Sequence, residues 1–137
     1  MKASLARQSA FPSLCPIAEA VNRLASEGGV EERGAVNTKR EIVDFILDLT
    51  GYTPDAPLTE YRLLEPSFGD GDFLLEAVER LLKSAALGGL LSFNNLAPAI
   101  RAVELHRTTY ERTQGRVSDL LRKSGIPEAD VVHLCTT

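Results

Sequence analysis

The residues best suited to bind a ligand lie in one short glycine turn. The run Glu65-Pro66-Ser67-Phe68-Gly69-Asp70-Gly71-Asp72 follows an apolar, strand-like stretch at residues 61–65 and leads directly into a helical apolar pattern at residues 73–82. Such turns lie at the carboxyl ends of strands, where α/β sheets bind ligands and glycines let backbone N–H groups approach them closely. A lone G-x-G also fits a tight turn with no ligand, so the surrounding residues must discriminate.

The acids around this turn indicate a positively charged ligand. A dinucleotide fingerprint requires a third glycine, where this sequence has Leu74. Carboxylates in the turn repel a pyrophosphate and, at close range, favour a cation. S-adenosylmethionine fits, because its sulfonium and ammonium outweigh its single carboxylate. The acids concerned are Glu65, Asp70 and Asp72.

A further acid, Glu104, ends the second predicted strand. An acid in that position can accept hydrogen bonds from both ribose hydroxyls of a nucleoside, whereas the alternative is a solvated charge at a strand end. The interval from Glu65 to Glu104 exceeds the usual spacing of about 20 residues. An insertion at residues 86–98 accounts for the difference.

The secondary-structure elements predicted on either side of these residues alternate between strand and helix. Apolar periodicity and turn residues predict helices at residues 16–26, 38–49, 73–87 and 108–123, and strands at residues 61–65, 99–105 and 129–134. The β-α-β-α-β order predicts a parallel sheet flanked by helices, which is a partial Rossmann-like α/β fold with about three strands. Residues 1–30 form an arm and short helix in this interpretation, and residues 31–137 form the domain.

The helix at residues 38–49 carries a specific expectation about its faces. Thr38 is expected to be its N-cap, and Gly51 stands where a C-cap belongs. The residues expected to face the core are Ile42, Phe45, Ile46 and Leu49.

Composition limits the class of protein. The chain has 137 residues, 44% of them hydrophobic and 25% charged, as in one ordinary globular domain. No apolar run approaches the roughly 20 residues of a membrane-spanning helix, and no secretory apolar region follows the N-terminus. A cytoplasmic protein is therefore expected. The net charge of −4 argues against a nucleic-acid binder that acts alone.

The cysteines and histidines predict neither a metal site nor a disulfide framework. Cys15 and Cys135 lie near opposite ends of the chain without a C-x-x-C pattern, and His106 and His133 are far apart. A metal site needs three or four convergent ligands, so no metal is expected.

Three segments together resemble a known family. Residues 65–75, Glu-Pro-Ser-Phe-Gly-Asp-Gly-Asp-Phe-Leu-Leu, resemble the [DE]-P-x-x-G-x-G-x-F-[LI] cofactor motif of N6-adenine DNA methyltransferases of restriction-modification systems. Residues 33–43 resemble the segment that these enzymes place before their first strand. Residues 100–105 resemble their second strand, whose acid binds the ribose of S-adenosylmethionine.

This resemblance implies a role for each matched residue. Asn37 and Thr38 would hold the methionine end of S-adenosylmethionine, and Glu104 would take its ribose. The turn would line the amino-acid moiety, and two phenylalanines would shape the pocket. The cofactor-binding set so implied is Asn37, Thr38, Glu65, Pro66, Phe68, Gly69, Gly71, Phe73, Glu104 and Leu105.

The sequence also departs from the family pattern. Asn37-Thr38-Lys39 stands where the family has aromatic-Thr-Pro, and Asp70 replaces the usual Ser or Thr. The catalytic N/D-P-P-Y/F motif, which holds the flipped adenine, is absent, so no catalytic residue is expected. The resemblance therefore implies the amino-terminal, cofactor-binding part of such an enzyme, inactive by itself and contacting DNA only within a complete enzyme.

Three other interpretations stay open. A small-molecule methyltransferase shares the glycine turn. A non-enzymatic module could pair with a separate catalytic or target-recognition chain through an open sheet edge and an apolar face. A dinucleotide-dependent oxidoreductase is disfavoured by Leu74 and by the acids of the turn.

Overall fold

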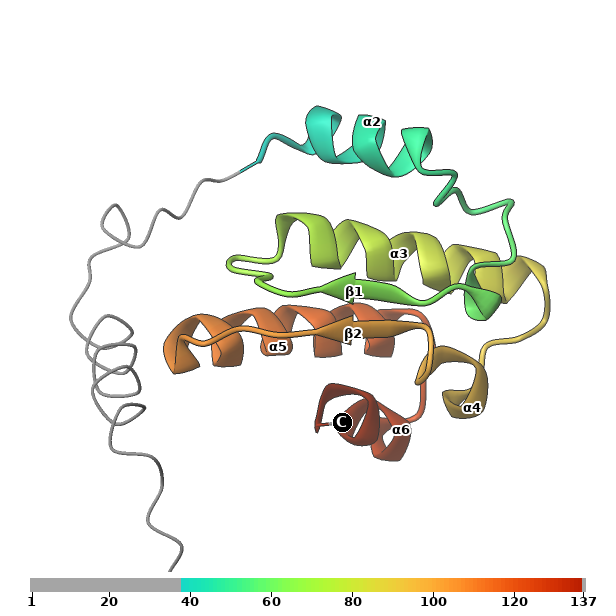
Figure 1. The fold of residues 1–137 in the computed structure, drawn as a ribbon. Helices are drawn as coiled ribbons and strands as arrows, with labels where there is room; N and C mark the ends of the chain where they lie inside the picture. Colours follow the sequence, from blue (N-terminus) through green and yellow to red (C-terminus); the bar gives the residue numbers. More distant parts are fainter. Residues whose placement is uncertain (1–37, 137) are drawn as a thin grey trace, which may run out of the picture. The chain divides into compact units, whose positions relative to one another are not determined.

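The computed structural model describes residues 38–136, and Figure 1 shows their path. The short helix and arm predicted at residues 1–30, and Asn37, lie outside the described residues. Among the described residues, no helix has the length and apolarity to cross a bilayer. The elements are α2 (Arg40–Leu49), the 3-10 turn η1 (Leu58–Glu60), β1 (Leu63–Glu65), α3 (Asp72–Leu87), α4 (Phe93–Leu96), β2 (Ile100–Ala102), α5 (Arg107–Lys123) and α6 (Glu128–Thr136).

The sheet consists of two parallel strands in the described part of the chain. Leu63 lies opposite Ile100 and Glu65 opposite Ala102. The pairing continues past the strand ends, because the N–H of Val103 donates to the carbonyl of Glu65 at 2.8 Å. The predicted parallel pairing is confirmed, but both strands are shorter than expected.

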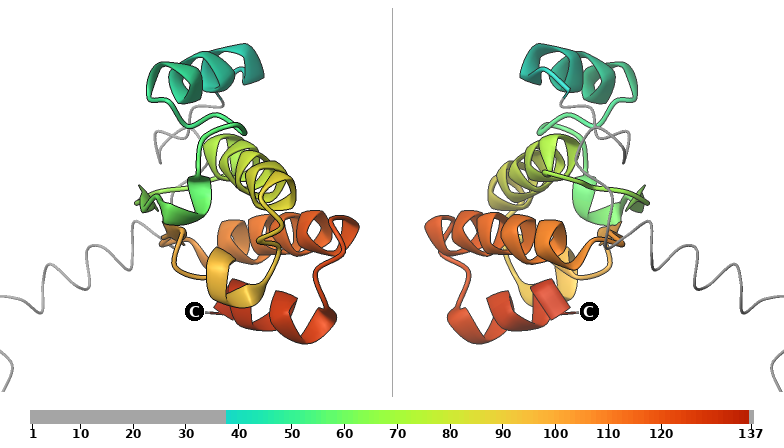
Figure 2. Two further views of the ribbon diagram at one scale, coloured as in Figure 1. Left: turned by 90° about the vertical axis from the view of Figure 1, so that its right-hand side faces the viewer. Right: turned by 90° about the vertical axis from the view of Figure 1, so that its left-hand side faces the viewer.

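Helices cover one face of this sheet. Figure 2 shows α3 and α5 on the same side of β1 and β2. Side chains alternate along a strand, so Leu63 and Ala102 pack toward the core while Leu64 points the other way. Leu64 is 66% exposed. The opposite face of the sheet is thus uncovered by the described residues.

Among the described helices, α3 contributes the largest number of buried apolar residues to the core. Gly71 precedes it in the left-handed conformation, with φ 87°, and Asp72 places a carboxylate in its first turn, where the helix dipole favours negative charge. Its apolar residues recur at helical spacing and are buried as predicted. They are Leu74, Ala77, Val78, Leu81, Leu82 and Ala85.

Helix α2 turns the face opposite to the predicted one toward the core. Val43 and Leu47 are buried, and the helix begins at Arg40, not at an N-cap Thr38. The stripe predicted to be buried is exposed instead, with Phe45 60% and Leu49 70% exposed. Its other two members, Ile42 and Ile46, are also exposed.

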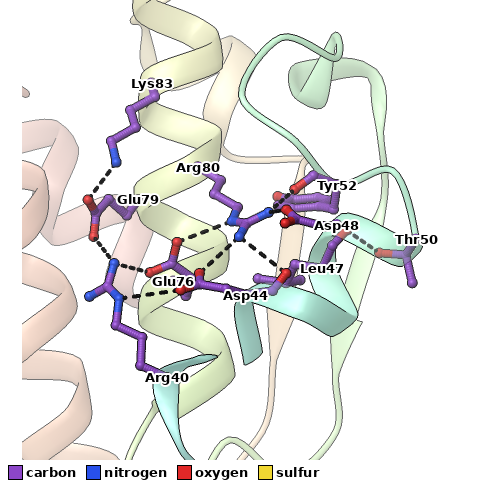
Figure 3. Close-up of polar contacts among 10 residues, drawn as sticks. All are labelled: Arg40, Asp44, Leu47, Asp48, Thr50, Tyr52, Glu76, Glu79, Arg80 and Lys83. Carbon is purple, nitrogen blue, oxygen red and sulfur yellow. Dashed lines mark hydrogen bonds and ion pairs between the residues drawn. The ribbon is translucent and has the colours of Figure 1, made fainter. Parts of the chain in front are cut away.

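Charged side chains explain this orientation of α2. Arg80 of α3 is only 6% exposed and donates to the carboxylates of Glu76, Asp44 and Asp48, as Figure 3 shows. It also donates to the carbonyl of Tyr52 at 3.1 Å. Because a buried guanidinium must be paired, the face of α2 that carries Asp44 and Asp48 lies against α3.

A second arginine, Arg40 of α2, extends this network. It pairs with the buried carboxylate of Glu76 at 2.5 Å and with Glu79 at 3.5 Å. The hydrogen bond from Arg80 lowers the pKa of Asp44. Burial opposes the charge of Arg80, but its carboxylate partners outweigh burial and raise its pKa. The α2–α3 contact is therefore as much ionic as apolar.

The predicted strand at residues 129–134 is wrong, because Glu128–Thr136 forms helix α6. The backbone N–H groups of Asp130 and Val131 donate to the carbonyl of Pro127, which starts the helix. Val131 is buried, and Leu134 and Cys135 pack against the core at the i+3 and i+4 positions. The apolar run thus follows helical spacing, and α6 packs on α5.

The remaining elements agree with the sequence pattern in type. Helix α5 ends at Lys123, before Ser124 and Gly125, as expected. The break predicted at residues 88–98 contains one short helix, α4, whose Leu96 is buried.

Candidate functional site

The glycine turn lies between β1 and α3, at the carboxyl ends of both strands. The N–H of Phe68 donates to the carbonyl of Val103 at 3.1 Å, and that of Gly71 to the carbonyl of Phe68 at 2.8 Å. Gly69 and Gly71 have φ angles of 50° and 87°, a region in which glycine has no steric penalty. The turn is therefore tied to the segment after β2.

Glu104 is brought directly to this turn. One carboxylate oxygen accepts the N–H of Gly69 at 2.9 Å, and the other accepts the N–H of His106 at 2.8 Å. A carboxylate oxygen has two acceptor positions, so each oxygen can take a further hydrogen bond. The two parts of the predicted site, 35 residues apart, thus meet through a single side chain.

Helix α5 holds the other side of the turn. The hydroxyl of Thr113, which is fully buried, donates to the carbonyl of Gly69 at 2.9 Å. Arg112 forms an ion pair with the carboxylate of Asp70, and Arg116 donates to the Asp70 carbonyl at 2.5 Å. Two side chains of α5 therefore hold the carbonyls of Gly69 and Asp70, and a third holds the Asp70 carboxylate.

The two glycines differ in what surrounds them. A Cβ at Gly71 would lie 2.7 Å from the Cγ2 atom of Thr113, so Gly71 is required by packing as well as by its φ. A Cβ at Gly69 would meet no atom within 4 Å. The turn is thus filled on the Gly71 side and open beside Gly69.

The segment upstream of α2 also reaches the turn. The backbone N–H of Thr38 donates to the Oδ2 atom of Asp72 at 2.8 Å. Thr38, Gly71 and Asp72 line a groove of about 470 Å³ together with Arg116 and Asp119 of α5. Lys39, not the predicted Thr38, is the N-cap of α2.

The other predicted site residues have different surroundings. Phe68 is 8% exposed and packs against Tyr110, with ring centroids 5.8 Å apart. Both rings line a partly open pocket of about 170 Å³. Phe73 is half-buried against the core, whereas Pro66 is exposed and Leu105 is 71% exposed beside Glu104.

The electrostatics of the turn differ from the expectation at Asp70. Its carboxylate pairs with Arg112, so it does not stand unpaired as a cation-attracting group. Glu65 accepts the N–H of Ser67 at 3.2 Å through one oxygen. The remaining negative charge near the turn comes from Glu65, Asp72 and Glu104.

Sequence reasoning did not identify the contribution of α5. Thr113 lies on the same helix face as Tyr110, Val117 and Leu121, all of which contact the core. That spacing of i, i+3, i+7 and i+11 would have marked Thr113 as a buried polar residue that needs a partner.

The histidines, cysteine and acids of the described residues do not gather into a metal centre. Among residues 38–136, no group of three or more such side chains is arranged to hold a metal ion. Cys135 is a free thiol whose sulfur lies 3.2 Å from the hydroxyl oxygen of Ser118.

The chain is similar in sequence to three type II methyltransferases. It is 50% identical over 125 residues to M.PaeR7I of Pseudomonas aeruginosa, a match that covers 90% of this chain and 22% of that enzyme. It is 47% identical over 102 residues to M.XhoI of Xanthomonas vasicola, covering 72% of this chain and 19% of the relative. For M.BstVI of Geobacillus stearothermophilus the identity is 43% over 101 residues, covering 72% and 18%.

Comparison with family models gave no match, and neither did comparison with solved structures. All three relatives are named type II methyltransferases, and the match covers a similar share of each. The chain is therefore a relative of the type II methyltransferases that spans about a fifth of their length.

Proposed function

We propose that residues 65–71 and Glu104 form the S-adenosylmethionine site of a DNA methyltransferase that acts on the N6 amine of adenine. The observation that carries this proposal is the hydrogen bond from the Gly69 N–H to Glu104, which unites the glycine turn with an acid at the end of the next strand. The resemblance of residues 65–75 to the adenine-methylase motif and the three type II relatives support it.

The residues present suit such a ligand. The turn is open beside Gly69, where a Cβ would meet nothing within 4 Å. Glu104 retains acceptor positions for ribose hydroxyls, and Leu105 offers an exposed apolar surface next to it. S-adenosylmethionine supplies the methyl group when bound, and Glu65 supplies negative charge near its ammonium.

This chain's contribution to methyl transfer would be positional. Fixing a donor in line with its acceptor removes much of the entropy barrier of a two-reactant step. Gly69 and Gly71 would hold the amino-acid end through the backbone, and Glu104 would orient the ribose. The groups that bind and orient adenine would come from outside this chain, so it transfers no methyl group alone.

Backbone amide NMR of the chain titrated with S-adenosylmethionine tests the cofactor proposal. The amides of Gly69, Gly71 and Glu104 should shift, and Glu104→Ala should weaken binding. Glu111→Ala is the control, since Glu111 is an exposed acid on α5 that pairs with Arg107. Shifts induced by NADH but not by S-adenosylmethionine would favour the oxidoreductase interpretation, and an unresponsive turn would contradict the proposal.

A specific observation also favours pairing with a larger methyltransferase part. The face of the sheet that carries Leu64 is uncovered, and α2 exposes an apolar stripe with Phe45 and Leu49. Adding this chain to M.PaeR7I from which the matched 125 residues have been deleted tests the idea. Methylation of DNA adenine by the mixture, but by neither component alone, supports both the pairing and the proposed reaction, whereas an inactive mixture with no complex would contradict the pairing.

A further inference from the structure

The contact between Thr38 and Asp72 joins two parts of the chain that are 34 residues apart. Its donor is a backbone N–H and its acceptor is a side-chain carboxylate, so the contact depends on the side chain at position 72 and not on the one at position 38. Asp72 is the first residue of α3 and directly follows Gly71. The carboxylate is therefore rigidly connected to the glycine turn.

The start of α2, two residues after Thr38, is also attached to α3. Arg80 and Arg40 fix α2 against α3, and Thr38 precedes α2 by two residues. Lys39, at the N-cap of α2, makes no side-chain capping bond among the described residues. The Asp72 contact thus attaches the backbone of Thr38, just upstream of these ion pairs, to the start of α3 beside the glycine turn.

The position of Thr38 affects the shape of the groove beside this contact, because Thr38 lines that groove. Thr38 and Asp72 line it together with Gly71 on one wall, and the Thr38 side chain is half-buried there. A shift of the segment would change the distance between Thr38 and the glycine turn. Small errors of this kind are costly where a site must hold a ligand in a defined geometry.

We infer that Asp72 is a positioning residue: its carboxylate holds the Thr38 backbone against the glycine turn, so that both contact the amino-acid end of one bound ligand. This inference rests on the proposed function for the identity of that ligand, S-adenosylmethionine. The hydrogen bond itself does not depend on the ligand.

Two variants of Asp72 separate the acceptor from the charge. Asp72→Asn keeps a side-chain oxygen that can accept the Thr38 N–H, whereas Asp72→Ala removes it, and both lose the same charge at the start of α3. Glu111→Gln is the control, because Glu111 is an exposed acid of α5 that pairs with Arg107 and does not line this groove. The readouts are hydrogen exchange at the Thr38 amide without ligand and the Kd for S-adenosylmethionine, both on the full chain.

Asp72→Ala should speed exchange at Thr38 and raise the Kd about tenfold each, as expected for the loss of one hydrogen bond to a charged group. Asp72→Asn should restore most of both, and Glu111→Gln should change neither. Unchanged Thr38 exchange in Asp72→Ala, or faster exchange with an unchanged Kd, would overturn the inference. If the wild-type chain ignores S-adenosylmethionine, the proposed function fails, while Thr38 exchange still decides whether Asp72 holds the segment.

Discussion

Side chains hold both backbone polar groups of Gly69, in the two peptide units that flank its Cα atom. Its N–H donates to Glu104, and its carbonyl accepts from the hydroxyl of Thr113. These partners come from opposite sides, one from the end of β2 and the other from α5. The turn is consequently shaped before any ligand binds, which lowers the ordering cost of binding.

Replacing Thr113 tests this arrangement at the residue scale. Thr113→Val conserves the shape but removes the hydroxyl, and should lower the free energy of unfolding by about 1 kcal/mol and speed hydrogen exchange at Gly69. Thr113→Ser keeps the hydroxyl but loses the methyl group that contacts Gly71. Urea unfolding and amide exchange measure the two effects.

The matched serine variant supplies the decisive comparison. Thr113→Ser should also lose some stability through packing, but its Gly69 amide should exchange at the wild-type rate. Equal Gly69 exchange in the valine and serine variants would show that the hydroxyl does not hold the turn.

The sequence pattern placed some of these residues at one turn and missed another. Glu65 and Glu104 lie at the ends of predicted strands, and Gly69 and Gly71 follow the first strand, so local spacing was enough to expect them near each other. Thr113 lies 44 residues from Gly69, and nothing in the local pattern of α5 pairs the two. Partners brought together by tertiary packing need a fold before they can be assigned.

At the scale of elements, α2 shows which interaction sets the orientation of a helix. Apolar periodicity alone favoured burial of the stripe that includes Phe45 and Leu49. The opposite face carries Val43 and Leu47 together with acids that pair with Arg80. Because an unpaired buried guanidinium is very costly, the paired face lies inward.

Arg80→Met should therefore be severely destabilising, by about 3 kcal/mol, because it leaves the buried Glu76 carboxylate without one of its two arginine partners. Adding Glu76→Gln to this variant should recover part of the loss, since the uncompensated charge is then removed. Urea unfolding of the wild type, both single variants and the double variant gives the coupling energy.

Lys83 of α3 offers a control for Arg80. Lys83→Met removes an exposed cation of the same helix, paired only with Glu79 among the described residues, and should change stability by no more than about 0.5 kcal/mol. A loss in Arg80→Met as small as that in Lys83→Met would mean that apolar contacts, not ion pairs, hold α2.

Helix α6 was the other element that sequence alone assigned wrongly. The run Val131-Val132-His133-Leu134 has strand-like composition, but its inward side chains recur at helical spacing, with Val131 buried and Leu134 packed against the core. The helix satisfies its own backbone and packs Val131 and Leu134 on α5. Parallel pairing of β1 and β2 was predictable because a strand–helix–strand order admits few arrangements.

At the scale of the whole described part, the sheet is packed on one side only. Core residues come from α3, α5 and the inward side chains of β1 and β2, while Leu64 and Val103 remain on the other face. Exposed apolar groups of this kind on a sheet with unpaired edges favour association with another polypeptide. That is the physical basis for expecting this chain to self-associate when no larger partner is present.

Two substitutions on the same strand test this asymmetry. Leu64 is 66% exposed, so Leu64→Thr should change the free energy of unfolding by no more than about 0.5 kcal/mol while reducing self-association in sedimentation velocity. Leu63 packs against the core from the neighbouring position, so Leu63→Thr should cost about 2 kcal/mol or more. Equal costs at the two positions would mean that the outer face is covered in solution. A large cost at Leu63 alone, with weaker association of Leu64→Thr, is the result that a sheet covered on one face requires.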